Sequence, residues 1–109
     1  MKKLSVIIPA RDEADNLPTC IRGIHRELEK QNVVHEILVI DDGSTDSTQS
    51  VLTEIGREIP ELVSLFNDEE NGFGRAVRLG LQEFSGDAVA IMMADLSDSP
   101  QDLVRYWQK

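Results

Sequence analysis

Two stretches decide the fold, LSVIIPARDE at residues 4–13 and EILVIDDGST at residues 36–45. Each begins as an apolar run rich in branched residues and ends in a polar, acidic turn. The runs lack the polar alternation of a half-exposed strand, which is the pattern of a strand buried on both faces. Such strands occur in parallel sheets that helices cover on each side. The two stretches therefore predict strands of an α/β protein, each ending in a polar loop.

Segments with helical spacing separate these strands from each other and from two more. Apolar residues recur every three or four positions after residue 16, between residues 51 and 59, and between residues 76 and 84. Further strand-like runs cover residues 62–66 and 88–94, and a capping-box spacing from residue 99 opens a last helix. Four strand–helix units imply a Rossmann-like, doubly wound parallel sheet in the order 3-2-1-4. We expect residues 1–109 to form this one domain.

The composition excludes several classes of protein. The 109 residues carry 11 Lys and Arg against 20 Asp and Glu, and a net charge of −9 repels nucleic-acid backbones. The apolar run at residues 88–94 is far shorter than the roughly 20 residues of a membrane-spanning helix. The N-terminal apolar run meets charged residues at once and lacks a signal-peptide cleavage site. Cys20 is the single cysteine and cannot form a disulfide within the chain, which suits a reducing compartment. Together these features predict a cytoplasmic protein with no transmembrane segment and no nucleic-acid partner.

Acidic loops follow three of the predicted strands, at residues 9–13, 41–44 and 95–98. In the order 3-2-1-4 these strands are neighbours, so their loops meet at the carboxyl edge, where ligands of such sheets bind. Gathered carboxylates repel one another and need a reason to coexist. A divalent cation with oxygen ligands, Mg²⁺ or Mn²⁺, is one reason, and it would let an acidic protein hold a phosphate. Asp41 could instead accept a hydrogen bond from the imino N–H of a nucleobase.

Four motifs in a fixed order carry a resemblance to a known family. They are VIIPARDEADNL (residues 6–17), VIDDGSTD (39–46), NGFGRA (71–76) and MADLSDSP (93–100). In this order and spacing they resemble the N-terminal half of family-2 glycosyltransferases with the GT-A fold. The chain looks closest to the dolichyl-phosphate mannosyltransferase-like branch, which transfers a sugar from a nucleotide to a polyprenyl phosphate. The resemblance covers essentially the whole chain.

The resemblance also implies roles for individual residues. The nucleotide-binding residues that it implies are Pro9, Ala10, Arg11, Glu13, Asp41, Asp42, Gly72, Gly74 and Ala94. Asp95 matches the second Asp of the Asp-x-Asp metal motif and is the implied catalytic residue. Asp95 and Asp98 are the implied ligands of Mg²⁺ or Mn²⁺.

The chain departs from the family's pattern at two positions. Arg11 stands where many members carry an aromatic residue that stacks on the base, and its guanidinium plane can stack there instead. Met93 stands where the first Asp of the metal motif is expected. Because this leaves only Asp95 and Asp98 as implied ligands, we expect metal binding to be weaker than with the full motif.

The implied reaction is attack of an acceptor oxygen on the anomeric carbon of a UDP- or GDP-sugar, with inversion. The implied acceptor is a lipid phosphate such as a polyprenyl phosphate, which would place the protein at the cytoplasmic face of a membrane. Acceptor residues follow the metal motif in the family, so we expect this chain to be truncated at its C-terminus. Two alternatives stay open: a non-catalytic remnant or subunit of the same fold, and a receiver-like Mg²⁺-dependent module using Asp41, Asp42 and Asp95.

Other side chains that can bind metals or react have simpler interpretations. Cys20 lies on an apolar stripe and Met92 in an apolar run, so we expect both in the core. His25 falls in the first helix and His35 just before the second strand, and neither has a partner at ligand spacing along the chain. We therefore expect both histidines at the surface or at a strand boundary, without a binding role.

Overall fold

The computed structural model describes residues 2–67 and 72–94, and the helix expected after residue 99 lies outside them. Strands and helices alternate in the order β1 (Lys3–Ala10), α1 (Leu17–Lys30), β2 (Val34–Asp41), α2 (Thr48–Glu58), β3 (Leu62–Phe66), α3 (Phe73–Glu83) and β4 (Ala88–Ile91). The strands form one four-stranded sheet in the order β3-β2-β1-β4, and every pair is parallel. The predicted α/β class and strand order are confirmed.

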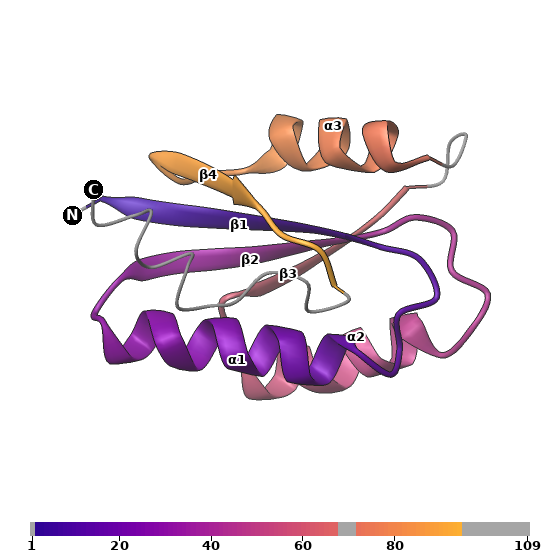
Figure 1. The fold of residues 1–109 in the computed structure, drawn as a ribbon, viewed down its shortest axis with the longest axis horizontal. Helices are drawn as coiled ribbons and strands as arrows, with labels where there is room; N and C mark the ends of the chain where they lie inside the picture. The colour runs from indigo at the N-terminus through magenta and orange to yellow at the C-terminus, as the bar shows by residue number, and fades with distance from the viewer. Residues whose placement is uncertain (1, 68–71, 95–109) are drawn as a thin grey trace.

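Helices cover both faces of the sheet (Figure 1). α1 and α2 lie on one face and α3 lies on the other, so the central strands β1 and β2 are enclosed by two helical layers. The unbroken apolar runs of these two strands are accordingly buried along almost their whole length. The larger part of the core fills the space between the sheet and the α1–α2 layer, and a smaller part lies beneath α3.

α1 follows from its sequence pattern. The helix begins after Asn16, and Pro18 lies in its first turn, where the missing N–H would have no helical partner. The apolar stripe of α1 is buried at every position, and its members are Leu17, Cys20, Ile21, Ile24 and Leu28. Burying each aliphatic side chain of this size contributes about 1.5–3 kcal/mol. Cys20 is therefore a core residue, as expected, and so is Met92, of which 4% is exposed.

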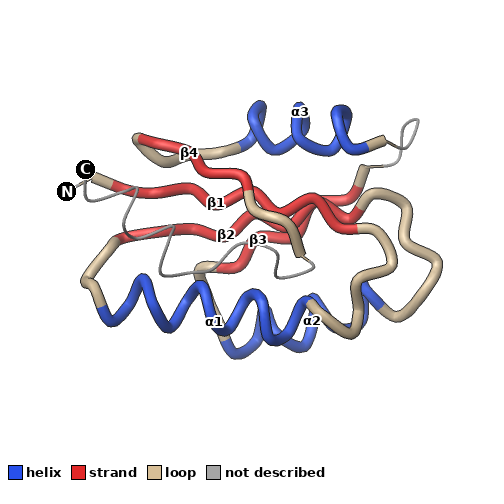
Figure 2. The backbone as a smooth tube through the Cα atoms, in the orientation of Figure 1, coloured by secondary structure: helices blue, strands red, loops and turns tan. Residues whose placement is uncertain are grey.

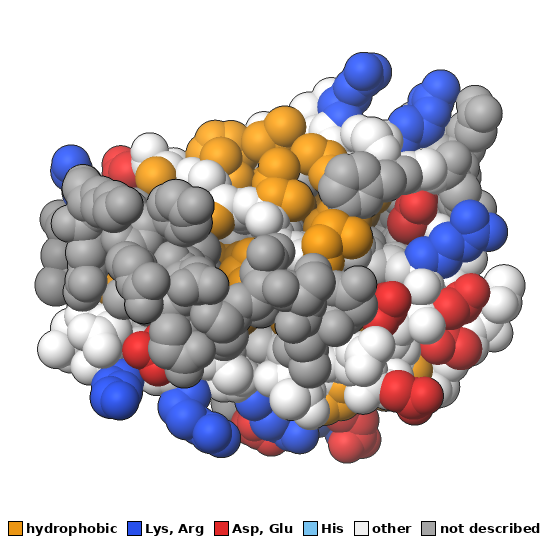
Figure 3. Space-filling model, in the orientation of Figure 1, with side chains coloured by type: hydrophobic (Ala, Val, Ile, Leu, Met, Phe, Trp, Pro, Cys, Tyr) orange, Lys and Arg blue, Asp and Glu red, His pale blue; other side chains and the backbone are white. Residues whose placement is uncertain are grey.

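β4 is shorter than the sequence predicts, because it ends at Ile91 and not at residue 94. The N–H of Met92 still donates to the carbonyl of Ile7 at 3.0 Å, and the chain continues beyond it as a loop (Figure 1). The apolar side chains of Val89 and Ile91 remain exposed on this edge strand. Figure 3 shows hydrophobic side chains gathered on this side of the molecule, over α3 and β4. Within the described ranges, no helix has the length and apolar character needed to cross a bilayer.

Candidate nucleotide-binding site

The loops after β1 and β2 lie side by side at the carboxyl edge of the sheet (Figure 2). Ala10 faces Asp41 in the parallel register, and the N–H of Asp42 donates to the carbonyl of Ala10 at 2.8 Å. Parallel strands end at the same edge, so the two acidic motifs meet although about thirty residues separate them in the chain. The predicted meeting of these loops is confirmed.

Asp12 fastens the two loops together. Its carboxylate Oδ1 accepts hydrogen bonds from the N–H groups of Thr45 at 2.7 Å and Asp46 at 3.2 Å. Its own N–H donates to the hydroxyl of Ser44 at 2.9 Å. The backbone of Asp12 is left-handed, with φ of 54°, a conformation that Asp tolerates better than most residues. Asp12 is a residue that the sequence motifs did not single out, because its role depends on a loop distant in the chain.

Asp46 completes this contact from the other side. Its Oδ2 accepts the N–H of Ala14 at 3.3 Å, and its Oδ1 accepts both the hydroxyl and the N–H of Thr48 at the start of α2. The hydrogen bond from the Thr48 hydroxyl is the largest influence holding the pKa of Asp46 below its ordinary value. The carboxylate therefore stays ionised while it joins the first loop to the beginning of α2.

Asp41 offers an unused acceptor at the centre of this edge. Only 2% of the residue is exposed, and its Oδ1 accepts the N–H of Ser44 at 3.0 Å. Its Oδ2 is buried and has no hydrogen-bond partner within the part of the chain that the structure describes. A buried acceptor without a partner costs about 1–3 kcal/mol, and more when it is charged. Such an oxygen is suited to a donor that a ligand brings.

Asp42 uses both of its carboxylate oxygens within the protein. Oδ1 accepts a hydrogen bond from the side-chain amide of Asn67 at 2.8 Å, and Oδ2 accepts the N–H of Gly72 at 3.0 Å. Gly72 caps the N-terminus of α3, so Asp42 connects the end of β2 to the start of that helix. The structure thereby places Gly72 at the same edge as the other motifs.

The expected residues of the first loop differ in exposure. Pro9 and Ala10 are buried at the end of β1, whereas Arg11 is exposed. Glu13 is half-buried, and its carboxylate accepts a hydrogen bond from the Asn16 side chain at 2.8 Å. The exposed guanidinium of Arg11 is thus available at the rim, while Glu13 is engaged at the beginning of α1.

The expected residues of the other motifs lie near or beyond the ends of the described segments. Gly74 is exposed in the first turn of α3, and Ala94 is buried with 1% exposure. Met93, which replaces the first Asp of the metal motif, is 37% exposed. Asp95 and Asp98 lie outside the described residues. Their roles as metal ligands, and that of Asp95 in catalysis, remain predictions.

The two histidines contradict the expectation that they lack partners. His35 is buried, with 5% exposure, and its Nε2 lies 3.0 Å from Nδ1 of the half-buried His25. The packing of α1 against β2 brings the two rings together from positions ten residues apart, a spacing that no local periodicity reveals. The pair lies where α1 ends and β2 begins, at the amino ends of the strands and opposite to the carboxyl edge described above.

A parallel sheet in the order 3-2-1-4 with helices on both faces defines a Rossmann-like α/β domain. The chain belongs to glycosyl transferase family 2, whose family model matches residues 5–109. The resemblance inferred from the four motifs is confirmed.

Individual relatives agree with this assignment. The chain is 33% identical over 110 residues to an undecaprenyl-phosphate 4-deoxy-4-formamido-L-arabinose transferase of Salmonella choleraesuis. This match covers 100% of the chain and 34% of the relative. A Pyrobaculum calidifontis mannosyltransferase, solved in complex with GDP-Man and Mn²⁺, shares 27% identity at a TM-score of 0.74, over 86% of this chain and 28% of that one. Mannosyl-3-phosphoglycerate synthase from Rubrobacter xylanophilus shares 29% identity at a TM-score of 0.78, over 92% and 33%. The fold is that of the N-terminal part of GT-A glycosyltransferases, and the chain spans about a third of these relatives.

Proposed function

We propose that this chain is the nucleotide-sugar-binding part of an inverting glycosyltransferase. The observation that carries the proposal is the buried Oδ2 of Asp41, which has no hydrogen-bond partner among the described residues. Uracil and guanine both present an imino N–H, and a carboxylate can only accept hydrogen bonds. A UDP- or GDP-sugar would therefore supply the donor that Asp41 lacks. The GDP-Man bound to the Pyrobaculum relative supports this class of ligand.

The surrounding residues would position such a nucleotide. Pro9 and Ala10 are buried at the end of β1 and would lie beneath the nucleotide, and the exposed side chain of Arg11 would stack on the base. Asp42 would act indirectly, by holding the Gly72 N–H and with it the start of α3. These contacts bind and orient the nucleotide before any chemistry occurs.

Asp95 and Asp98 are the proposed ligands of a divalent cation, Mg²⁺ or Mn²⁺. A bound cation would neutralise the negative charge that grows on the departing nucleoside diphosphate. The Mn²⁺ in the complex of the Pyrobaculum relative supports the use of a divalent cation. Because Met93 replaces one carboxylate of the motif, we propose that nucleotide phosphates supply a larger share of the ligands here.

The proposed acceptor is a polyprenyl phosphate, reached at the cytoplasmic face of a membrane. The undecaprenyl-phosphate transferase of Salmonella supports this acceptor class. An ionised phosphate oxygen is already a nucleophile and needs little general-base help. We propose that acceptor contacts come from a further part of a longer protein, of which residues 1–109 are the nucleotide-binding domain.

The receiver-like alternative has less support. It requires Asp41 and Asp42 to share a Mg²⁺ ion through free oxygens. Both oxygens of Asp42 are instead engaged by protein donors at 2.8 and 3.0 Å. A metal at this pair would have to share the oxygens of Asp42 with the donors that connect it to Asn67 and to the start of α3.

Calorimetric titration with UDP and GDP, with and without Mn²⁺, tests the proposal. We expect one nucleotide to bind more tightly than the other, and Mn²⁺ to increase its affinity. No binding of either nucleotide to the folded chain in either condition would overturn the proposal. A polyprenyl-phosphate transfer assay on the longer protein would separate an active enzyme from a non-catalytic remnant.

Asp41→Asn sharpens this test. The variant keeps an oxygen for the Ser44 N–H but turns an amide donor toward the imino N–H of the base. A hydrogen bond to a charged group contributes about 1.5–3 kcal/mol, so affinity should fall roughly 10- to 100-fold and discrimination between bases should disappear. Asp15→Asn, the same change of charge at an exposed position in the connection between β1 and α1, is the matched control and should bind like the wild type. Unchanged base preference in Asp41→Asn would refute the role of Asp41.

A further inference from the structure

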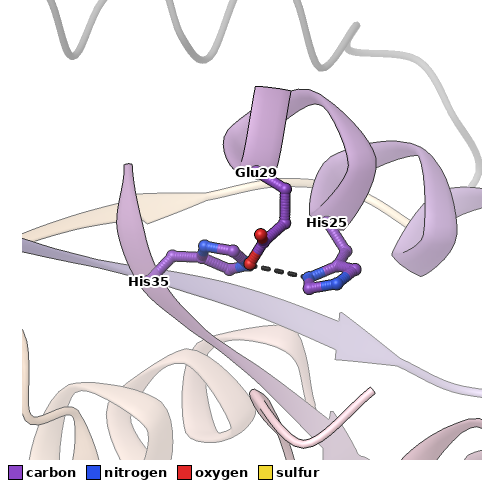
Figure 4. A group of neighbouring side chains, drawn as sticks. All are labelled: His25, Glu29 and His35. Atoms are coloured by element: carbon purple, nitrogen blue, oxygen red, sulfur yellow. Dashed lines mark hydrogen bonds between the residues drawn. The ribbon is translucent and has the colours of Figure 1, made fainter. Parts of the chain in front are cut away.

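A second group of ligand-type side chains lies at the edge of the sheet away from the nucleotide side. It consists of His25 and Glu29 on α1 and His35 on β2, and one potential ligand atom from each lies within 4.8 Å of the other two. His25 and Glu29 are four residues apart, so they project from the same face of the helix. Figure 4 shows the three side chains extending toward one another from these two elements.

The tautomer of His35 is determined by its surroundings. Its Nδ1 lies 2.9 Å from the carbonyl oxygen of Val33, which can only accept, so Nδ1 carries the proton. In this tautomer Nε2 carries a lone pair and no proton, and that lone pair faces Nδ1 of His25. A carbonyl that holds the far nitrogen of a ligating imidazole is the usual outer partner of a metal-binding histidine. His35 is thus already oriented as a ligand.

The distances suit a tetrahedral ion. Two nitrogens bound to tetrahedral Zn²⁺ at 2.0–2.1 Å lie about 3.3 Å apart. The facing nitrogens of His25 and His35 are 3.0 Å apart, with the ring planes inclined at 54°. A widening of a few tenths of an ångström, with the rings turned so that both lone pairs converge beside the line joining the nitrogens, would admit the ion in exchange for their mutual hydrogen bond.

A fourth candidate ligand lies near His25. Oε1 of Glu61, in the connection between α2 and β3, is 3.8 Å from Nδ1 of His25. This oxygen is buried and has no hydrogen-bond partner in residues 2–67 and 72–94. The cluster also borders an open hollow of about 310 Å³, which gives an ion a path from solvent; its lining residues are Glu29, Asn32, Val33, Val34, His35 and Glu61.

We propose that His25, Glu29 and His35 bind a transition-metal ion of the Zn²⁺ type, with Glu61 as the fourth ligand. Imidazole nitrogen favours Zn²⁺, Co²⁺, Ni²⁺ and Cu²⁺ over Mg²⁺ and Mn²⁺, so this site differs in metal preference from a carboxylate site at the nucleotide edge. The bound ion joins the C-terminal end of α1 to the start of β2 and to the segment before β3. It stabilises the domain by mass action and takes no part in sugar transfer.

Titration with Co²⁺, followed by its visible absorption, tests this site directly. We expect the intense bands of tetrahedral cobalt with nitrogen ligands, displaced by one equivalent of Zn²⁺, and a rise in Tm with Zn²⁺ that a chelator reverses. His25→Ala should abolish the bands, and loss of one ligand should weaken binding by at least the roughly 10- to 100-fold that an outer partner contributes. The absence of tetrahedral bands in the wild type would overturn the proposal and leave the two histidines as a hydrogen-bonded pair.

Two further variants keep the test decisive. Glu29→Gln changes an exposed side chain, so the variant should fold normally. It should bind Co²⁺ more weakly than the wild type, and this test remains valid even if His25→Ala is unstable. Glu54→Gln, at an exposed position of α2, is its matched control and should bind like the wild type. Asp95→Asn with Asp98→Asn should leave the cobalt spectrum unchanged. Loss of the spectrum in that double variant, or its persistence in both His25→Ala and Glu29→Gln, would refute the assignment.

Discussion

Gly80 lies where α3 packs on β1, and Gly80→Ala tests that packing. A Cβ at this position would lie 2.7 Å from Cγ2 and 3.0 Å from Cδ1 of Ile7. Ile7 is fully buried in a central strand, and its branched side chain has few alternative rotamers. Overpacking costs about 1–3 kcal/mol, and a 2.7 Å contact belongs in the upper part of that range. Ala gains up to about 1 kcal/mol in helix propensity, so the net loss should be about 1–2 kcal/mol.

Gly56 in α2 is the matched control for this substitution. A Cβ there meets nothing within 4 Å, and the residue is exposed. The propensity gain is then not opposed by any clash. Gly56→Ala should therefore raise the free energy of unfolding by about 0.5–1 kcal/mol.

Urea unfolding followed by circular dichroism measures both variants. Stability changes should appear in the midpoint, with an unchanged slope m of about 1–3 kcal/mol/M. The two midpoints should move in opposite directions and differ by about 1 M, from the energies above and that slope. If both variants were stabilised alike, α3 would not pack on β1 as described.

Three further predictions concern the carboxylates. Asp12→Ala should lower the free energy of unfolding by about 1–2 kcal/mol in thermal unfolding, because the Thr45 N–H loses its acceptor and Ala has to adopt a left-handed backbone. Asp12→Asn should lose less stability than Asp12→Ala. Asp42→Ala should speed hydrogen exchange of the N–H at the start of α3 roughly tenfold, since that N–H loses its acceptor. Burial opposes the charge of Glu36, but hydrogen bonds led by that from Ser5 outweigh it and hold its pKa below the ordinary 4.5. Its stabilisation is therefore present above pH 4.5 and lost as pH falls through the lowered pKa, so the Tm difference between wild type and Glu36→Gln should shrink in acid.

The elements and their order could be predicted because they depend on local patterns. Unbroken apolar runs such as residues 4–10 indicate strands buried on both faces, and the stripe from Leu17 to Leu28 has the period of a helix. Strands that alternate with helices allow few sheet topologies, and the order β3-β2-β1-β4 is one of them. The position of Asp41 at the carboxyl edge follows from the same reasoning.

By itself, then, the sequence determined the class of fold, much of the core, and the acidic carboxyl edge where we propose that a nucleotide binds. Only the tertiary structure decided what each polar side chain contacts. Asp12 reaches a loop 33 residues away, Asp42 holds an N–H 30 residues away, and His35 meets His25 across the packing of a helix on a strand. The physical reason is that burial repeats with the period of the backbone, whereas these hydrogen bonds depend on register and packing between segments distant in the chain.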